Sequence, residues 1–277
     1  MKILVTGGNG FIGRSLIKVL KLEHKVFSPS RTDLDLTDSE AVEKYFLNKY
    51  FDSVIHCAIT GGRRTENDTK DVLSDNILMF FNLMRNKMKF KSFINFSSGA
   101  ELDRSINMKE AKNNPNKFFP KDYYGISKNI ISRLIYNDKQ FFNLRLYGVF
   151  GSEEGSDRFI SRCIRKIKSG KKIEIFQDKQ FDFFYIDDLV LLVLKILNSN
   201  QSLKSNELDL VYKHKYTLSD IGKLLLHKLN SSNGILIKDK HIGLSYIGSY
   251  DSFFDNIEFK GLEYGIDCMI KNAKSID

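Results

Sequence analysis

The sequence predicts an α/β protein built on a doubly wound parallel sheet, followed by a smaller lobe. Over roughly the first half, short apolar runs alternate with longer segments whose apolar residues recur at helical spacing, which is the pattern of βαβ units. A glycine-rich segment also follows the first apolar run directly and opens the first helical segment. Because crossover helices cover both faces of a parallel sheet, we expect a buried sheet between two helical layers.

Five short apolar runs are expected to form the strands of this sheet, at 3–5, 25–27, 53–56, 92–96 and 141–146. Apolar residues that recur every three to four positions predict the helices between them, at 11–22, 39–50, 71–89 and 124–137. Asp38 or Ser39 is suited to cap the second of these helices. The polar stretch 103–122 interrupts the alternation and is expected to be a long surface loop.

The alternation loosens after about residue 150. Helices are expected there at 156–169, 187–198 and 217–229, and short strands at 173–176, 206–212 and 235–238. Residues 239–277 show no clear pattern. No flexible linker separates this part, so we divide the chain into a larger first domain, 1–150, and a smaller lobe, 151–277, whose chain could return to the main sheet.

The composition is that of a globular chain. Of its 277 residues, 42% are hydrophobic and 28% are charged, which excludes disordered and fibrous classes. The net charge is +9, but the basic residues are scattered as singles and pairs. We therefore expect no nucleic-acid partner, because such a partner needs clustered cations. A basic surface also suits an anionic substrate or cofactor.

The cysteines and the apolar stretches bear on location. Cys57, Cys163 and Cys268 lie far apart without C-x-x-C spacing, so we expect no disulfide framework, no metal site, and a reducing cytoplasmic location. The most apolar stretch, Leu189–Leu197, is nine residues long and contains Lys195. It is too short to cross a membrane, so no membrane partner is expected.

The glycine-rich segment has the form of a dinucleotide-binding turn. Gly7, Gly10 and Gly13 stand three residues apart, after a strand and at the start of a helix. Gly7 suits a tight turn, Gly10 lets the main chain approach a pyrophosphate, and Gly13 lets the helix pack closely on the strand. The N–H groups at Phe11 and Ile12 begin this helix and would bind phosphate. We therefore expect a Rossmann-type nucleotide site in the first domain.

The end of the second strand indicates which dinucleotide binds. An NAD site usually has an acidic residue there, which bonds the ribose hydroxyls. Ser30 and Arg31 stand at this place instead, and a guanidinium matches the geometry of a 2′-phosphate. We expect NADP, with NAD as the alternative, and contacts with the adenine from Asp35 and Leu36.

Three later segments extend this pattern: Tyr124-Gly125-Ile126-Ser127-Lys128, then 144–151 (LRLYGVFG), then 182–188 (DFFYIDD). With the glycine turn, and in this order, they resemble the motifs of the extended short-chain dehydrogenase/reductase family. This is the group of nucleotide-sugar epimerases, dehydratases and 4-ketoreductases. The resemblance covers roughly residues 1–190 and implies an enzyme that binds a nicotinamide cofactor and a nucleotide sugar.

The resemblance also implies roles for individual residues. Tyr124 would exchange a proton with the sugar oxygen, although an ordinary phenol has a pKa near ~10. Lys128 lies four residues on, where its charge would lower that pKa and its amine would bond the nicotinamide ribose. A hydroxyl at the end of the fourth strand normally completes the set, and we assign this role to Ser98.

The chain departs from the family pattern near this serine. Relatives often carry the catalytic hydroxyl at the third position of the segment that begins with Ser97, and Gly99 occupies that position here. Ser97, or a main-chain N–H with water, is therefore the alternative to Ser98, and both Ser97 and Gly99 are expected to contact the substrate. Cys57 and Ala58 replace residues that line the cofactor in relatives.

Other family positions are replaced in the second half. Gly148 stands where relatives have a substrate-contacting asparagine, and Phe181 stands where they have an arginine that often faces the nucleotide. We expect Arg158 and Arg162 to meet the substrate diphosphate instead. Arg145 is expected to be structural, and Asn76 matches an asparagine that bridges the main chain near the catalytic residues.

These inferences favour one activity and leave two alternatives. The first is NADPH-dependent reduction of a nucleotide-diphosphate 4-keto-6-deoxy-sugar. An NAD-dependent nucleotide-sugar 4-epimerase would use the same residues, and a non-catalytic NAD(P)-binding sensor would use only the cofactor site. The family implies a homodimer formed by the helices at 71–89 and 124–137.

Overall fold

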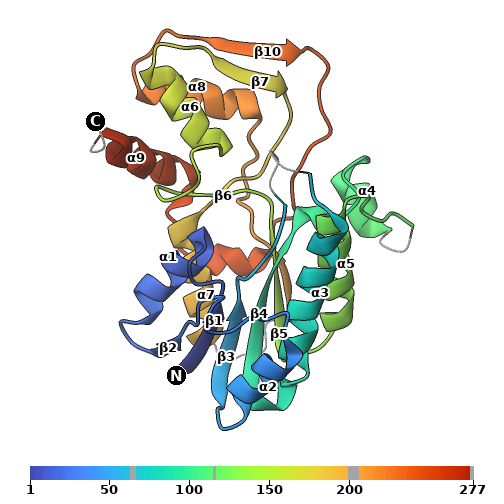
Figure 1. Ribbon diagram of the computed structural model, residues 1–277. Helices are drawn as coiled ribbons and strands as arrows, with labels where there is room; N and C mark the ends of the chain where they lie inside the picture. The colour runs from blue at the N-terminus through green and yellow to red at the C-terminus, as the bar shows by residue number, and fades with distance from the viewer. Residues whose placement is uncertain (63–66, 115–116, 199–205, 275–277) are drawn as a thin grey trace. The chain divides into compact units, whose positions relative to one another are not determined.

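The computed structural model describes residues 1–62, 67–114, 117–198 and 206–274 (Figure 1). The chain forms two compact units. The first comprises Met1–Asp103, Ala111–Arg145 and Leu192–Asp209, and the second comprises the remaining segments. Each unit is therefore discontinuous in sequence, whereas the sequence-based division at residue 150 is a single cut and stays a prediction.

A six-stranded sheet forms the first unit, and its strands run in the spatial order β2-β1-β3-β4-β5-β9. The pairs β1–β2, β1–β3, β3–β4 and β5–β9 are parallel. The strands are β1 (Lys2–Thr6), β2 (Lys25–Phe27), β3 (Phe51–His56), β4 (Phe90–Ser98), β5 (Phe141–Leu146) and β9 (Glu207–Asp209). The predicted doubly wound parallel sheet is confirmed, and its sixth strand comes from late in the chain.

The helices of this unit are α1 (Phe11–Leu20), α2 (Ser39–Phe46), α3 (Lys70–Met84) and α5 (Tyr123–Ile135). Figure 1 shows α2, α3 and α5 on one face of the sheet and α1 on the other. The apolar side chains of α2, α3 and α5 join those of the strands in one buried cluster, which includes Phe46, Phe80, Phe93 and Ile131. Asp38 caps α2 by accepting from the N–H groups of Glu40 and Ala41, as predicted.

The second unit holds shorter elements. They are β6 (Val149–Phe150), α6 (Phe159–Lys168), β7 (Ile173–Gln177), β8 (Phe184–Tyr185), the start of α7 (Ile186–Asn198), α8 (Leu218–Lys228), β10 (Ile235–Asp239) and α9 (Gly261–Lys274). The strands pair in parallel as β6–β8 and β7–β10. The carboxylate of Asp188, which is buried, accepts from the N–H groups of Lys260 and Gly261. The acidic end of the DFFYIDD motif therefore anchors the start of α9.

Three segments differ from the prediction. The helix expected over 71–89 ends at Met84 and gives way to a 3-10 turn at Lys87–Lys89. The expected loop at 103–122 contains the short helix α4 (Met108–Asn113), because Met108 and Ala111, three residues apart, are both buried. The unassigned tail contains α9, whose apolar residues lie among many polar ones in the sequence.

Candidate functional site

The glycine turn lies between β1 and α1. Gly7 has a φ of +66°, and a Cβ there would lie 2.5 Å from the main-chain nitrogen of Ala58. A Cβ on Gly13 would lie 2.4 Å from the carbonyl oxygen of Gly7. Both positions therefore require glycine, one for its conformation and one for the close packing of helix on turn. Gly10 is the N-cap of α1 and has no side chain to cap it, which leaves the first N–H groups of the helix to other acceptors.

The turn lies at the place where a doubly wound sheet binds its ligand. β2 and β3 pair with opposite edges of β1, so the chain changes direction across the sheet at β1. Ligands bind outside the carboxyl ends of the strands at such a switch point. Gly7 follows β1 and Cys57 follows β3, and the N–H of Cys57 donates to the carbonyl oxygen of Thr6. The residues predicted to line the cofactor are therefore neighbours at this edge.

The loop after β2 holds Ser30 and Arg31. The Ser30 N–H and hydroxyl both donate to one carboxylate oxygen of Asp33, at 3.0 and 2.6 Å. These bonds lower the pKa of Asp33, while the Arg31 side chain is exposed. Asp35 accepts from the N–H and hydroxyl of Thr37. The Leu36 side chain is buried in the core cluster, so a contact with adenine at this residue would come from its main chain.

Tyr124 and Lys128 begin α5. The carboxylate of Asp122, the N-cap, accepts from the N–H of Gly125 at 2.8 Å, which fixes the first turn. The Lys128 Nζ lies 5.8 Å from the centre of the Tyr124 ring and donates to the carbonyl oxygen of Phe96 at 2.6 Å. Burial lowers the pKa of Lys128 to about 8, against the opposing charge of Glu101. The amine thus keeps its charge at neutral pH in a buried position.

A turn after β3 packs against the Tyr124 ring. Gly62 has a φ of +75°, and a Cβ there would lie 2.7 Å from Tyr124 Cε2. The Gly62 N–H donates to Asp68 at 2.9 Å. Asn76 holds the same turn, since its amide exchanges two hydrogen bonds with the main chain of Thr60. The asparagine identified from the sequence therefore bridges main chain beside the tyrosine.

The two serines of the β4 segment have different surroundings. Ser97 is 2% exposed, and its hydroxyl donates to the carboxylate of Glu101. Ser98 is 9% exposed, and its hydroxyl accepts from the N–H of Ala100 at 3.2 Å. Gly99 is buried and begins a 3-10 turn, Gly99–Glu101. Of the two residues, Ser98 is slightly more exposed.

His56 ends β3 and Cys57 follows it, and the charge of Lys128 acts on both. The His56 Nδ1 lies 2.8 Å from the Thr6 hydroxyl oxygen. Burial, and then the charge of Lys128, lower the pKa of His56 to about 3, so the ring is neutral. Burial also raises the pKa of the Cys57 thiol. His56 is 4% exposed and does not act as a cationic acid near neutral pH.

Arg158 and Arg162 belong to the second unit. Arg158 donates to the carbonyl oxygen of Val149 at 3.2 Å, and the Arg162 guanidinium lies 6.0 Å from the Phe159 ring centre. Both side chains are exposed. Phe181 is 6% exposed and packs between Phe183 and Tyr246. The side chain that replaces the family arginine is thus part of an aromatic cluster.

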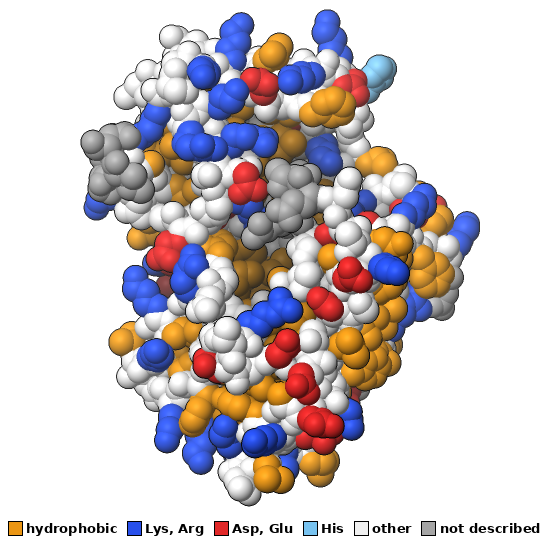
Figure 2. Space-filling model, in the orientation of Figure 1, with side chains coloured by type: hydrophobic (Ala, Val, Ile, Leu, Met, Phe, Trp, Pro, Cys, Tyr) orange, Lys and Arg blue, Asp and Glu red, His pale blue; other side chains and the backbone are white. Residues whose placement is uncertain are grey.

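The sequence analysis missed a cluster of cations on α6. Residues 158–172 carry seven Lys or Arg and no acidic residue, so the description of the basic residues as scattered was wrong. A hollow of about 170 Å³ is lined by Arg162, Arg165, Lys166, Ser169 and Lys171. Figure 2 shows Lys and Arg gathered on this part of the second unit. Helical spacing places them on one face, which a count of neighbouring charges along the sequence overlooks.

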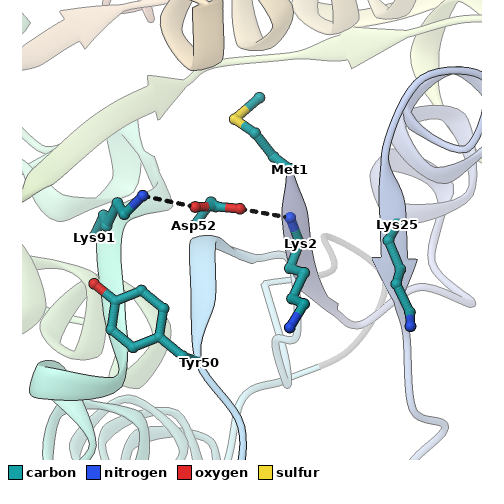
Figure 3. A pocket seen from close by; sticks show the side chains of 6 residues that line it. All are labelled: Met1, Lys2, Lys25, Tyr50, Asp52 and Lys91. Carbon is teal, nitrogen blue, oxygen red and sulfur yellow. Dashed lines mark hydrogen bonds and ion pairs between the residues drawn. The ribbon is translucent and has the colours of Figure 1, made fainter.

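A larger hollow, of about 510 Å³, lies at the opposite edge of the central sheet. Its lining includes Lys2, Lys25 and Lys91, which lie where their strands begin (Figure 3). Asp52 accepts from the Lys2 N–H at 2.7 Å and from Lys91 Nζ at 2.9 Å. Because the strands are parallel, this edge is the far end from the glycine turn, and the hollow belongs to a different place from the candidate site.

Within the part of the chain that the structure describes, no group of three or more His, Cys, Asp or Glu side chains is placed to hold a metal ion. Among the same residues, no helix combines the length and the apolar character needed to cross a membrane.

Comparisons with known proteins agree with this geometry. A model of the NAD dependent epimerase/dehydratase family matches residues 3–211. The CDP-abequose synthase of Yersinia pseudotuberculosis is 26% identical over 232 residues, which cover 76% of this chain and 78% of that protein. The GDP-L-fucose synthase of Azorhizobium caulinodans is 35% identical over 104 residues, 36% of this chain and 33% of that protein.

Solved structures share the fold over the whole chain. GDP-mannoheptose C4 reductase from Campylobacter jejuni, with NADP bound, has a TM-score of 0.78 at 17% identity and covers 99% of this chain and 98% of its own. UDP-glucose 4-epimerase from Thermotoga maritima has a TM-score of 0.81 at 20% identity, with all of both chains covered. At these identities the likeness establishes the fold.

Proposed function

The chain belongs to the NAD-dependent epimerase/dehydratase family, and we propose that it reduces a nucleotide-linked 4-keto-6-deoxy-sugar with NADPH. The observation that carries the proposal is the pair formed by Tyr124 and Lys128 at the start of α5, with Lys128 Nζ 5.8 Å from the Tyr124 ring centre. This pair lies on the unit that also holds the glycine turn. A sequence relative named CDP-abequose synthase and a fold neighbour named a C4 reductase, with NADP bound, support reduction over other reactions.

The residues at the switch point fit a dinucleotide. The turn at Gly7, Gly10 and Gly13 gives room for a pyrophosphate and directs the start of α1 toward it. Arg31 is exposed next to this edge of the sheet and suits a 2′-phosphate. The cofactor would supply the hydride that is added to the keto carbon.

The side chains of the protein supply the proton and the charge. Tyr124 would give its phenolic proton to the sugar oxygen as that oxygen becomes an alkoxide. Ser98 would donate a second hydrogen bond to the same oxygen. Lys128, charged at neutral pH, would favour the tyrosinate left behind and bond the ribose of the cofactor. Arg158 and Arg162 would bind the diphosphate of the substrate.

An NAD-dependent 4-epimerase is the second candidate. The observation in its favour is the TM-score of 0.81 with a UDP-glucose 4-epimerase, and both reactions need the same acid–base pair. An epimerase returns the hydride to the sugar, so it shows no net use of the cofactor. Retention of a tightly bound NAD after purification would distinguish it from a reductase.

We also propose that the protein is a homodimer and is located in the cytoplasm. Leu78 and Phe81 on α3, and Leu134 on α5, are 43% to 51% exposed, which is costly for a helix face in water. A homodimer formed by α3 and α5 would cover them. All three cysteines are free, which suits a cytoplasmic protein.

The test is a set of reactions with nucleotide 4-keto-6-deoxy-sugars that differ in the nucleotide. The absorbance of NADPH and of NADH is followed in parallel. Consumption of one NADPH per sugar establishes the reductase, and the nucleotide that supports it identifies the substrate class. Bound NAD without net consumption favours the epimerase. Cofactor binding without turnover of any sugar favours a non-catalytic sensor.

A further inference from the structure

Glu101 lies in the turn that follows β4 and is 4% exposed. One carboxylate oxygen accepts from the hydroxyls of Ser97 and Ser132, the latter at 2.5 Å. The other accepts from Arg145, whose Nε lies at 2.7 Å. The side chain is therefore fixed from three directions and turned into the protein.

An ion network continues from Glu101 across the sheet. Arg145, on β5, also pairs with Asp209 on β9. The second oxygen of Asp209 accepts from Lys112 Nζ at 2.7 Å. Arg145 and Asp209 are 4% and 2% exposed. Glu207 also lies 3.7 Å from the Arg145 guanidinium, and the Lys112 side chain is 37% exposed. The network thus joins three acidic and two basic side chains, of which Glu101, Arg145 and Asp209 are buried.

Such a network is not explained by stability alone. Buried ion pairs lose about as much in desolvation as they gain in attraction, and apolar residues of the same volume are often as stable. What a fully satisfied polar network does provide is one defined arrangement of the groups that share it.

The network connects the two elements that carry the proposed catalytic residues. Ser97 precedes Ser98 at the end of β4, and Ser132 lies one turn after Lys128 on α5. The contact between the two elements is close, since a Cβ on Gly125 would lie 2.4 Å from the carbonyl oxygen of Ala100. The Glu101 carbonyl oxygen also accepts from the Asn129 amide at 2.9 Å.

We propose that Glu101 is a positioning residue, whose buried carboxylate joins Ser97 to Ser132 and thereby sets the position of Ser98 relative to Tyr124 and Lys128. Here the Ser97–Glu101–Ser132 bridge is called the clamp. This positioning role rests on the proposed reductase activity, because Ser98, Tyr124 and Lys128 are the residues proposed to carry out that reaction. Its carboxylate also opposes the effect of burial on the pKa of Lys128, which helps to keep this amine charged.

The test compares two charge-neutralising variants in the full-length protein. Glu101→Gln removes the charge of the clamp, whereas Asp209→Asn disturbs the same ion network without touching Ser97 or α5. We expect Glu101→Gln to lower kcat by about tenfold or more, since a displacement of 1 Å can cost more than that, with NADPH affinity nearly unchanged. Asp209→Asn should lower the melting temperature comparably but keep kcat within about threefold of wild type. Ser132→Ala is a milder variant of the clamp for use if Glu101→Gln does not fold.

A second readout does not depend on a substrate. Competitive acetylation of Lys128 at a series of pH values, followed by mass spectrometry, measures its pKa in the apoprotein. We expect a lower pKa in Glu101→Gln and an unchanged one in Asp209→Asn. Equal losses of kcat in both variants, or a clamp variant with wild-type kcat and wild-type Lys128 titration, would overturn the positioning role. If the wild type reduces no sugar, the proposed reaction fails, and an unchanged Lys128 titration in Glu101→Gln would also show that the clamp does not act on this amine.

Discussion

The two ends of the central sheet differ in how their charged groups are held. At the carboxyl ends, Lys128 and Glu101 are nearly inaccessible, and each is bonded to partners on other elements. At the amino ends, the pair Lys91–Asp52 is 66% and 29% exposed in its side chains. The larger hollow is at the amino ends, but the ion pair there is partly exposed to water. The comparison shows that buried polar groups with several hydrogen bonds indicate the candidate catalytic site better than the size of a hollow does.

The largest expected effect is at Tyr124. The change Tyr124→Phe removes the proposed proton donor and keeps the ring, so turnover should fall by about 10³-fold. Affinity for NADPH, measured by fluorescence titration, should change little. If binding and turnover were lost together, the residue would have a structural role instead.

The second-largest effect is expected at Gly62, in the turn after β3 that packs against Tyr124. Gly170, on the second unit, is a matched control. Gly62 and Gly170 both have positive φ, but a Cβ meets the Tyr124 ring at the first and nothing within 4 Å at the second. Both changes to Ala should cost about 1 kcal/mol or more in backbone strain. Only Gly62→Ala should also reduce kcat, by about 10–100-fold through displacement of the ring. Equal kcat values for the two variants would show that the turn does not position Tyr124.

A smaller effect is expected for cofactor choice. Arg31→Ala should raise the Kd for NADPH by about tenfold or more, because a charge-assisted contact with the 2′-phosphate is lost. The Kd for NADH should stay within about twofold. Isothermal titration with both cofactors checks this, and parallel changes would remove the case for NADP.

The buried amine of Lys128 predicts a pH effect on the apoprotein. Its folded-state pKa, about 8, is below the ordinary value of 10.5. Between these values the unfolded chain binds more protons, so the stability of the folded state rises with pH over this window, by up to about 1.4 kcal/mol per unit. Relative to Lys128→Met, the wild type should therefore gain stability from pH 8 to 10. Urea unfolding at each pH measures the difference, and a constant gap would contradict it.

The smallest effect is expected at the amino ends of the sheet. Lys91→Ala breaks an exposed ion pair with Asp52, and such pairs contribute at most about 1 kcal/mol. The melting temperature should fall by a few degrees at most, and kcat and both cofactor affinities should be unchanged. A loss of activity here would mean that the large hollow takes part in the reaction after all.

Much of the fold followed from local patterns. The strand before Gly7, the helix after Gly13, and the cap at Asp38 depend on residues close in sequence, so the first half could be assigned in order. Helix α9 could not, because its few apolar residues lie among many polar ones in the sequence. The membership of β9 in the main sheet depends on pairing with a distant strand.

The candidate site likewise combines features set by nearby residues with features set by distant ones. Tyr124 and Lys128 are one helical turn apart, so the sequence alone brings them together. The direction of the Glu101 side chain depends on Ser132 and Arg145, which are 31 and 44 residues away. The local sequence therefore does not indicate this role for Glu101. The choice between Ser97 and Ser98 likewise depends on which hydroxyl the fold covers.

The late origin of β9 has a consequence for synthesis on the ribosome. Asp209 follows Arg145 by 64 residues, which corresponds to roughly 3–13 s of translation. During that interval β5 is an open edge, and the Arg145 guanidinium lacks its partners on β9, Glu207 and Asp209. An exposed strand edge of this kind invites association with other chains. The nascent first unit is therefore more exposed to association with other chains than one whose sheet closes early.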